Sequence, residues 1–553
     1  MSKSQESMHK TTNKFASRRS LKKTFIQLRE KLLRYSIIML ILASGCGSDQ
    51  TTRILSRSMP GEPRTLDPHI ADDSFSFLIL RDLYEGLTAE DRQGRVVPGV
   101  ASSWDIDKSG TTYAFHLRPN AQWSDGQRIV AGEFVQGLRH AVDPNTGSGS
   151  AAVLSVIRGA SEIIAGHKPA STLAVTAIDD QSLRIELEHP APYIVQILSQ
   201  PVAAPLHLPQ ASPQDSLKTK NPVSDGPYTL TKRVNGSYIE LTRNPHYWDA
   251  SNVPIERVRY LNAESEATEL REYSSGQLDM TSTIPMPDLD RITKSIPKEV
   301  QTAPIVGTLF LDLNMTKLPL RDSKIVRQAL AMATDRVSIA RYIMMGVAPA
   351  YSLVAPGASG YVSASYGWAK WSRERQIQYA QELLARAGYS PQHPLHLKLY
   401  FNSNESIQRI MLAVADSWKK NLAVETELLP EEFRVFLAGR KDRHHWDAIR
   451  IGWYADFDDA SSFLEIFTTH NNQNDAGYSN IIFDKLIDAA RVEPDSATRL
   501  SMLEHAENIL LDDYPLVPIY FYQTRRLVKP YVGGAAITPM NHTYSKHLFW
   551  KTP

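Results

Sequence analysis

Hydrophobic and polar residues alternate along two short stretches of the chain, TYAFHLR at residues 112–118 and SLRIELE at residues 182–188. A period of two puts the apolar side chains on one face, which predicts half-buried β-strands. Apolar residues recur every three to four positions in four other stretches, which predicts helices over residues 323–333, 375–387, 407–421 and 497–511. Gly388 is placed to end the second of these helices and Ser406 to cap the third. Strands mixed with helices, without a regular βαβ repeat, indicate an α/β protein with mixed sheets.

The chain of 553 residues is long enough for several domains, and its 42% hydrophobic and 22% charged residues are typical of a globular protein. Its formal net charge of +1 is unevenly distributed. Residues 1–45 carry ten Lys and Arg against two Glu, a net charge of +8, which leaves −7 on the remainder. Because binding to nucleic acid needs a clustered basic surface, this acidic remainder argues against nucleic acid as a partner.

The N-terminus has the pattern of an export signal. A basic stretch precedes an apolar run at residues 35–43, which is far shorter than the ~20 residues that span a bilayer. The small residues Ser44 and Gly45 then precede Cys46, the only cysteine, in an arrangement that resembles the lipobox of bacterial lipoproteins. We predict a lipoprotein signal peptide at 1–45, lipidation and membrane anchoring through Cys46, and a polar tether at 46–52. The alternative is an ordinary helix over 15–45 with Cys46 as a core thiol.

Motifs of common enzymes are missing from the sequence. It contains no GxSxG elbow, no HExxH zinc helix and no GxxxxGK[ST] phosphate loop. The glycine-rich residues 147–152 follow a turn where a dinucleotide site requires a strand, so we expect a loop there. The adjacent His444 and His445 are expected at the surface, and the acidic run that begins at Asp456 lacks the glycine of a calcium loop. No catalytic residue, metal or cofactor is predicted.

Several short motifs succeed one another in an order that is more specific than any one of them. They include GEPRTLDPH (61–69), RDLYEGL (81–87), PGVASSW (98–104), WSDG (123–126), DGPY (225–228), NPHYW (244–248), RIGWYAD (450–456) and RLVKPYVGG (526–534). In this order the chain resembles, over about residues 53–553, the oligopeptide-binding extracytoplasmic solute-binding proteins of peptide ABC importers, solute-binding protein family 5.

The resemblance implies an α/β, periplasmic-binding-protein-like type II fold, with two lobes of mixed sheets and an additional inserted domain. It implies a division into lobe 1 from residues 53–84, 209–306 and 523–553, an inserted flanking domain at 85–208, and lobe 2 at 307–522. The implied function is that of a monomeric binding protein in the periplasm or cell envelope. It would enclose short peptides between its lobes and deliver them to the permease and ATPase subunits of an ABC importer.

A protein that accepts many peptides must bind what all of them share, namely the backbone and the two charged termini. The resemblance assigns the peptide ammonium to Asp456 and the carboxylate of a short peptide to Arg450. Ile407 stands where some relatives place a histidine for longer peptides, which favours tripeptides or an unusual ligand. Further positions of the cavity wall are expected at Trp453, Tyr454, Asp72, Ser74 and Ser224.

Two other functions stay open at this point. Relatives of the same fold bind ligands other than ordinary peptides. A muropeptide, which has a peptide-like end, a nickel complex or haem is therefore an alternative ligand. A secreted hydrolase is a remote alternative, since neither nucleophile nor metal motifs are found.

Overall fold

The computed structural model describes residues 53–207 and 222–552, and all of these except Arg53 belong to the compact unit Ile54–Pro553. One four-stranded sheet has the order β1-β10-β9-β8, in which β1 is parallel to β10 and the other pairs are antiparallel. Its strands are β1 (Ile54–Met59), β8 (Tyr228–Val234), β9 (Tyr238–Arg243) and β10 (Arg257–Asn262). Helix α2 (Ser74–Leu83) packs Ile79 and Leu83 into the core of this sheet.

A second, antiparallel sheet has the order β4-β5-β7-β6. It consists of β4 (Ala101–Ile106), β5 (Thr112–Leu117), β6 (Val175–Ala177) and β7 (Ser182–Glu186). Both strands that the alternation predicts, β5 and β7, are therefore confirmed. Helix α3 (Ala131–Val142) covers the sheet through Phe134 and Leu138. Short elements complete this region: β2 (Thr88–Glu90), β3 (Val96–Pro98), α4 (Ala160–Ile164) and α5 (Ile194–Ile197).

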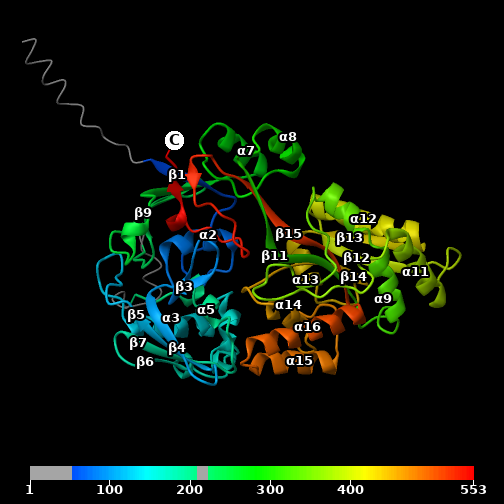
Figure 1. The fold of residues 1–553 in the computed structure, drawn as a ribbon, viewed down its shortest axis with the longest axis horizontal. Helices are drawn as coiled ribbons and strands as arrows, with labels where there is room; N and C mark the ends of the chain where they lie inside the picture. Colours follow the sequence, from blue (N-terminus) through cyan, green and yellow to red (C-terminus); the bar gives the residue numbers. More distant parts are fainter. Residues whose placement is uncertain (1–52, 208–221, 553) are drawn as a thin grey trace, which may run out of the picture. The chain divides into compact units, whose positions relative to one another are not determined.

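The third sheet is mixed and has the order β13-β12-β14-β11-β15. Its strands are β11 (Val300–Leu313), β12 (His396–Asn402), β13 (Glu425–Glu431), β14 (Ala448–Tyr454) and β15 (Leu516–Leu527). Alternate residues of β11 enter different cores. Leu309 and Leu311 pack with the helices on one face of the sheet, α9 (Lys324–Ala333), α11 (Arg373–Arg386) and α12 (Glu405–Leu422). Phe310 packs with the helices on the other face, α14 (Ser461–Leu464), α15 (Ile481–Val492) and α16 (Ser496–Asp513). Helices thus cover both faces of the sheet (Figure 1).

The four predicted helices are confirmed as α9, α11, α12 and α16, each with slightly different ends. Gly388 follows α11 with a φ of +88°, a conformation that glycine adopts without strain. The predicted cap of α12 is wrong. Asn404 begins that helix instead, because its side chain accepts hydrogen bonds from the backbone N–H groups of Ser406 and Ile407. The glycine-rich residues 147–152 form turns and a 3₁₀ segment, as expected for a loop.

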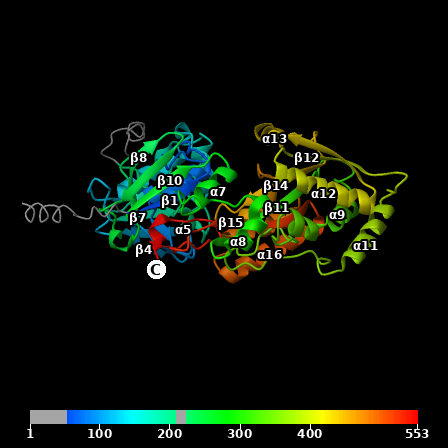
Figure 2. The same ribbon diagram turned by 90° about the horizontal axis from the view of Figure 1, so that it is seen from above.

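The long strands β11 and β15 extend beyond the mixed sheet and connect it to another part of the fold (Figure 2). Residues 300–304 pair with 523–527, where Leu527 packs in a small core with α7 (Glu266–Ser274) and α8 (Leu289–Ser295). The remainder of the two strands pairs within the mixed sheet, and the register shifts between Pro304 and Thr308. Such an irregularity bends a strand locally. The domain boundaries implied by the resemblance stay a prediction.

Within the described residues, no helix combines the length and the apolar character that crossing a bilayer requires. The same residues hold no cluster of three or more His, Cys, Asp or Glu side chains suited to a metal ion. The predicted signal peptide, Cys46 and the tether lie outside the described residues.

Candidate ligand-binding site

Strand β14 presents two different faces, since side chains alternate along a strand. Ile449 and Ile451 are buried in the core with α14–α16, and Trp453 packs against the same core. The indole nitrogen of Trp453 donates a hydrogen bond of 2.8 Å to the carbonyl of Ser462. Arg450 and Tyr454 belong to the opposite face. Trp453 is thus partly buried against this core, and its place in a cavity wall stays a prediction.

Arg450 has no acidic partner among the described residues. Its Nη2 donates to the hydroxyl of Tyr522 at 3.1 Å, its Nη1 lies 3.4 Å from the side-chain oxygen of Asn402, and its buried Nε has no acceptor. A guanidinium that is held only by neutral groups can still receive a carboxylate, and the planar donor set of arginine fits that group in a bidentate manner.

Gly452 makes room for this arginine. A Cβ atom at this position would lie 2.4 Å from the Tyr522 hydroxyl and 2.8 Å from Nη2 of Arg450. Any other residue would therefore displace the guanidinium or its partner. Tyr454, which is half exposed, stacks on Tyr522 with ring centroids 4.3 Å apart. Gly452 lies within β14 and pairs with Leu309, so the strand continues through it without a turn.

Asp456 lies two residues beyond the end of β14. Its backbone N–H donates to Ser462 Oγ at 2.9 Å, and its carbonyl accepts a hydrogen bond of 2.9 Å from Gln200 Nε2. Its carboxylate, by contrast, has no hydrogen bond or ion pair with any described residue. This side chain is accessible to solvent, but the surrounding protein desolvates the carboxylate and raises its pKa to about 6.

The neighbouring acids in the same loop are both occupied. Asp458 accepts hydrogen bonds from the N–H and the hydroxyl of Ser359, at 2.8 and 2.6 Å. Asp459 forms a bidentate pair with Arg499, at 2.7 and 2.8 Å. Of the three carboxylates, only that of Asp456 is left to bind a cation from outside the described chain.

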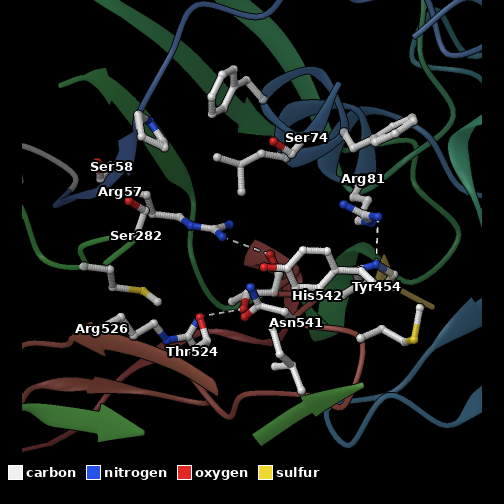
Figure 3. Close-up of a pocket in the computed structure, with 18 of the residues that line it drawn as sticks. Arg57, Ser58, Ser74, Arg81, Ser282, Tyr454, Thr524, Arg526, Asn541 and His542 are labelled. Carbon is white, nitrogen blue, oxygen red and sulfur yellow. Dashed lines mark hydrogen bonds between the residues drawn. The ribbon is translucent and has the colours of Figure 1, made fainter. Parts of the chain in front are cut away.

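A cavity of about 580 Å³ begins where β14 ends (Figure 3). Ser74 at the start of α2 and Tyr454, two of the positions expected in a cavity wall, line it, and Ala455 continues its wall toward Asp456. Arg450, Trp453 and Asp456 are not among its lining residues. The rest of the wall comes from β1, Pro60, α2, residues 280–282, residues 305–306 of β11, the last part of β15 and residues 539–543.

Comparison with known proteins identifies the family. Residues 95–475 match the family described as "Bacterial extracellular solute-binding proteins, family 5 Middle". The chain belongs to this family. The periplasmic oligopeptide-binding protein OppA of Escherichia coli is 36% identical over 504 residues, which are 90% of this chain and 92% of OppA.

Solved structures of related proteins have the same fold as this family 5 protein. The unliganded open form of the periplasmic murein tripeptide-binding protein MppA has a TM-score of 0.80 at 33% identity, covering 90% of this chain and 97% of MppA. Haemophilus influenzae OppA in complex with the peptide RPPGFSPFR has a TM-score of 0.75 at 30% identity, covering 90% of this chain and 99% of that one. The predicted fold class is confirmed, and the chain is a binding protein and not an enzyme.

Two wall positions predicted in this family 5 protein have other roles here. Ser224 is fully buried and donates to the carbonyl of Tyr228 at 3.1 Å, so its side chain offers no surface to a ligand. Asp72 is exposed, pairs with Arg64 at 3.0 Å, and is not a lining residue of the cavity. Ile407 belongs to the core around α12 and is 7% exposed.

Four basic residues of the cavity wall were missed in the sequence. Arg81 and Arg526 lie inside the family motifs RDLYEGL and RLVKPYVGG, which we interpreted only as marks of the fold. Arg57 and His542 carry no signal in the sequence, because nothing local distinguishes an arginine or a histidine whose neighbours come from distant segments.

Proposed function

We propose that this family 5 protein is the extracytoplasmic oligopeptide-binding subunit of an ABC importer. It binds short peptides by their charged ends and backbone, and delivers them to permease and ATPase subunits. The observation that carries the proposal is the pair of unpartnered charges on one segment, the carboxylate of Asp456 and the guanidinium of Arg450. The names of the relatives, an oligopeptide-binding and a murein tripeptide-binding protein, agree with it.

The open edge of β14 is suited to the peptide backbone. On one side β14 pairs with β11 along its whole length, but on the other side β12 pairs only with Ala448 and Ile449. Within the described chain, no strand pairs with residues 450–454 on that second side. An extended peptide can therefore add to the edge through backbone hydrogen bonds, whatever its side chains are.

The two charges then fix the direction of the peptide. With its ammonium at Asp456 and its carboxylate at Arg450, the peptide runs antiparallel to β14. Residues six apart on an extended strand are about 20 Å apart, and the arginine side chain shortens the gap further. This span fits a short peptide. Closure about the bent strands β11 and β15 would exclude water from both ion pairs, so that a missing partner becomes costly.

The direct test of this function is to identify what co-purifies with the protein. The protein is isolated without refolding, denatured, and the released small molecules are analysed by mass spectrometry. We expect peptides of a few residues with free amino ends. A muropeptide is the second candidate ligand, because MppA is named as a murein tripeptide-binding protein. Its recovery would leave the roles of both charges unchanged and would change only the class of ligand. Recovery of only haem or a nickel complex would contradict the proposal.

Peptide binding is expected to weaken in acid. An ammonium group needs the ionised form of Asp456, whose pKa of about 6 in the free protein means that the carboxyl is mostly neutral at pH 5. Affinity should therefore be highest above pH 7 and fall about tenfold between pH 7.5 and pH 5. Calorimetry of one tripeptide across this range measures it. Affinity that is equally pH-dependent in Asp456→Asn would assign the effect to another group.

We also propose export and lipid anchoring. The relatives are named as periplasmic proteins, and Cys46 with the residues before it supports a lipoprotein signal. Replacement of Cys46 with serine should release the protein from the membrane fraction into the soluble one, as fractionation with an antibody would measure. Unchanged membrane association would contradict the lipid. We further propose that the protein acts as a monomer.

A further inference from the structure

The cavity beside Tyr454 is lined by cations and by no acid. Arg57, Arg81 and Arg526 contribute to its wall, and no Asp or Glu is among its lining residues (Figure 3). The three arginines come from β1, α2 and β15, so that only the fold brings them together.

Arg526 is buried without a carboxylate. It is 6% exposed and has no ion pair with any residue in the described ranges. Its donors go to neutral oxygens, among them the carbonyl of Ala535 at 2.8 Å and Thr543 Oγ1 at 2.8 Å. Burial, and then the positive charge of Arg57, lower its pKa to about 10, so the group is still a cation at neutral pH.

Arg57 forms a buried ion pair, but with a carboxylate that other groups also engage. Its nearest carboxylate, Asp82, is 3.8 Å away. That carboxylate also accepts hydrogen bonds from the Tyr260 hydroxyl at 2.5 Å and from the N–H of Ser545 at 2.8 Å. Arg57 itself donates to Tyr260, to Ser545 and to the carbonyl of Thr543.

Arg81 keeps donors for a ligand. Its Nη2 lies 2.8 Å from Nε2 of His542. Because a guanidinium can only donate, His542 must accept at Nε2 and carry its proton on Nδ1, which faces Glu90 at 2.9 Å. His542 is therefore neutral, and it separates Arg81 from the nearest acid. No described residue accepts a hydrogen bond from Nε or Nη1 of Arg81.

We propose that this cavity is an anion-binding compartment of the ligand site, and that it favours ligands with a carboxylate in addition to the one at the C-terminus. The proposal rests on the proposed function and narrows its substrate class. Tyr454 lies in the wall of the compartment and stacks on Tyr522, the partner of Arg450, so the compartment borders on the proposed peptide site. Its volume of about 580 Å³ accommodates a side chain of any peptide residue. A carboxylate there would offset positive charge that the protein itself compensates only in part, since Arg526 has no acidic partner among the described residues.

The test is a series of tripeptides titrated into the unmodified protein by calorimetry. Tri-alanine is compared with peptides in which each position in turn carries glutamate or its neutral analogue glutamine. We expect one position at which glutamate binds at least tenfold more tightly than glutamine, because hydrogen bonds to charged groups are the stronger ones. The proposal would be overturned if tri-alanine binds and the glutamate and glutamine peptides have equal affinities at all three positions. That result would leave the proposed function standing. If tri-alanine itself does not bind, the result contradicts the proposed function, and with it the proposal that rests on it.

Variants then locate the effect. In Arg81→Gln the ratio of the affinities for the glutamate and glutamine peptides should fall toward one, while Arg81→Lys should keep part of it. Arg409→Gln serves as the matched control, since Arg409 is exposed and pairs with Glu405 on the same helix. Its ratio should equal that of the unmodified protein. A ratio that survives in Arg81→Gln would contradict the assignment of the anion to this cavity. Thermal melting of each variant identifies any loss of folding.

Discussion

Replacing Asp456 with asparagine is expected to lower the affinity for a tripeptide with a free amino end by at least a hundredfold. The carboxylate has no partner within the described chain, and in the closed protein the ammonium of the peptide would be its only counter-charge. Removing one partner of a buried ion pair typically costs about 3 to 5 kcal/mol, which is more than a hundredfold in affinity. Asparagine keeps the size of the side chain, so packing is nearly unchanged. Calorimetry measures the loss.

Two controls separate this role from a general effect of the acidic loop. Asp458→Asn, two residues further, removes a charge that Ser359 already binds, and should change the affinity less than threefold. An N-acetylated peptide should bind the unmodified protein as poorly as the free peptide binds Asp456→Asn. If the acetylated peptide binds the unmodified protein as well as the free one, Asp456 does not recognise the ammonium.

Arg450→Ala is expected to weaken tripeptides by roughly tenfold to a hundredfold and pentapeptides much less. A tripeptide with its ammonium at Asp456 ends near Arg450, whereas a pentapeptide places its carboxylate beyond this residue. Hydrogen bonds to charged groups contribute about 1.5 to 3 kcal/mol, which corresponds to that range. The measurement is the ratio of the two affinities in the variant and in the unmodified protein. Equal losses for both lengths would contradict the assigned role.

Gly452→Ala tests the same arrangement without removing a charge. The added methyl group would meet the end of Arg450 and the hydroxyl of Tyr522, both of which can move. The variant should therefore fold with a nearly unchanged melting temperature and still lose affinity for tripeptides selectively. A variant with unchanged affinity for both lengths would mean that the position of the guanidinium is unimportant.

Local patterns were sufficient for the elements and for the family. The alternation at residues 112–118 became β5, and the helical repeat at 407–421 became α12, because burial of one face is encoded by neighbours a few positions apart. The order of the motifs along the chain identified family 5. The cap of α12 could not be decided in this way. Both Asn404 and Ser406 are capping residues, and only the backbone geometry selects between them.

The site itself depends on contacts between distant segments. The resemblance selects Asp456, but the physical difference from Asp458 and Asp459 lies in the partners of these two acids, Ser359 and Arg499, which come from distant segments. Ser224 looks like a wall position until the fold directs it into the interior.

By itself the sequence determined two strands and four helices, since these depend on residues close together in the chain. It also determined the family, through the order of short motifs, and from that resemblance the acid and the arginine that we assign to the peptide ends. Only the tertiary structure decided which charges are left without partners and that arginines 57, 81 and 526 meet in one cavity. Whether a charge has a partner depends on the distance in space between segments that lie up to nearly 470 residues apart in the chain, and no local pattern of residues predicts that distance.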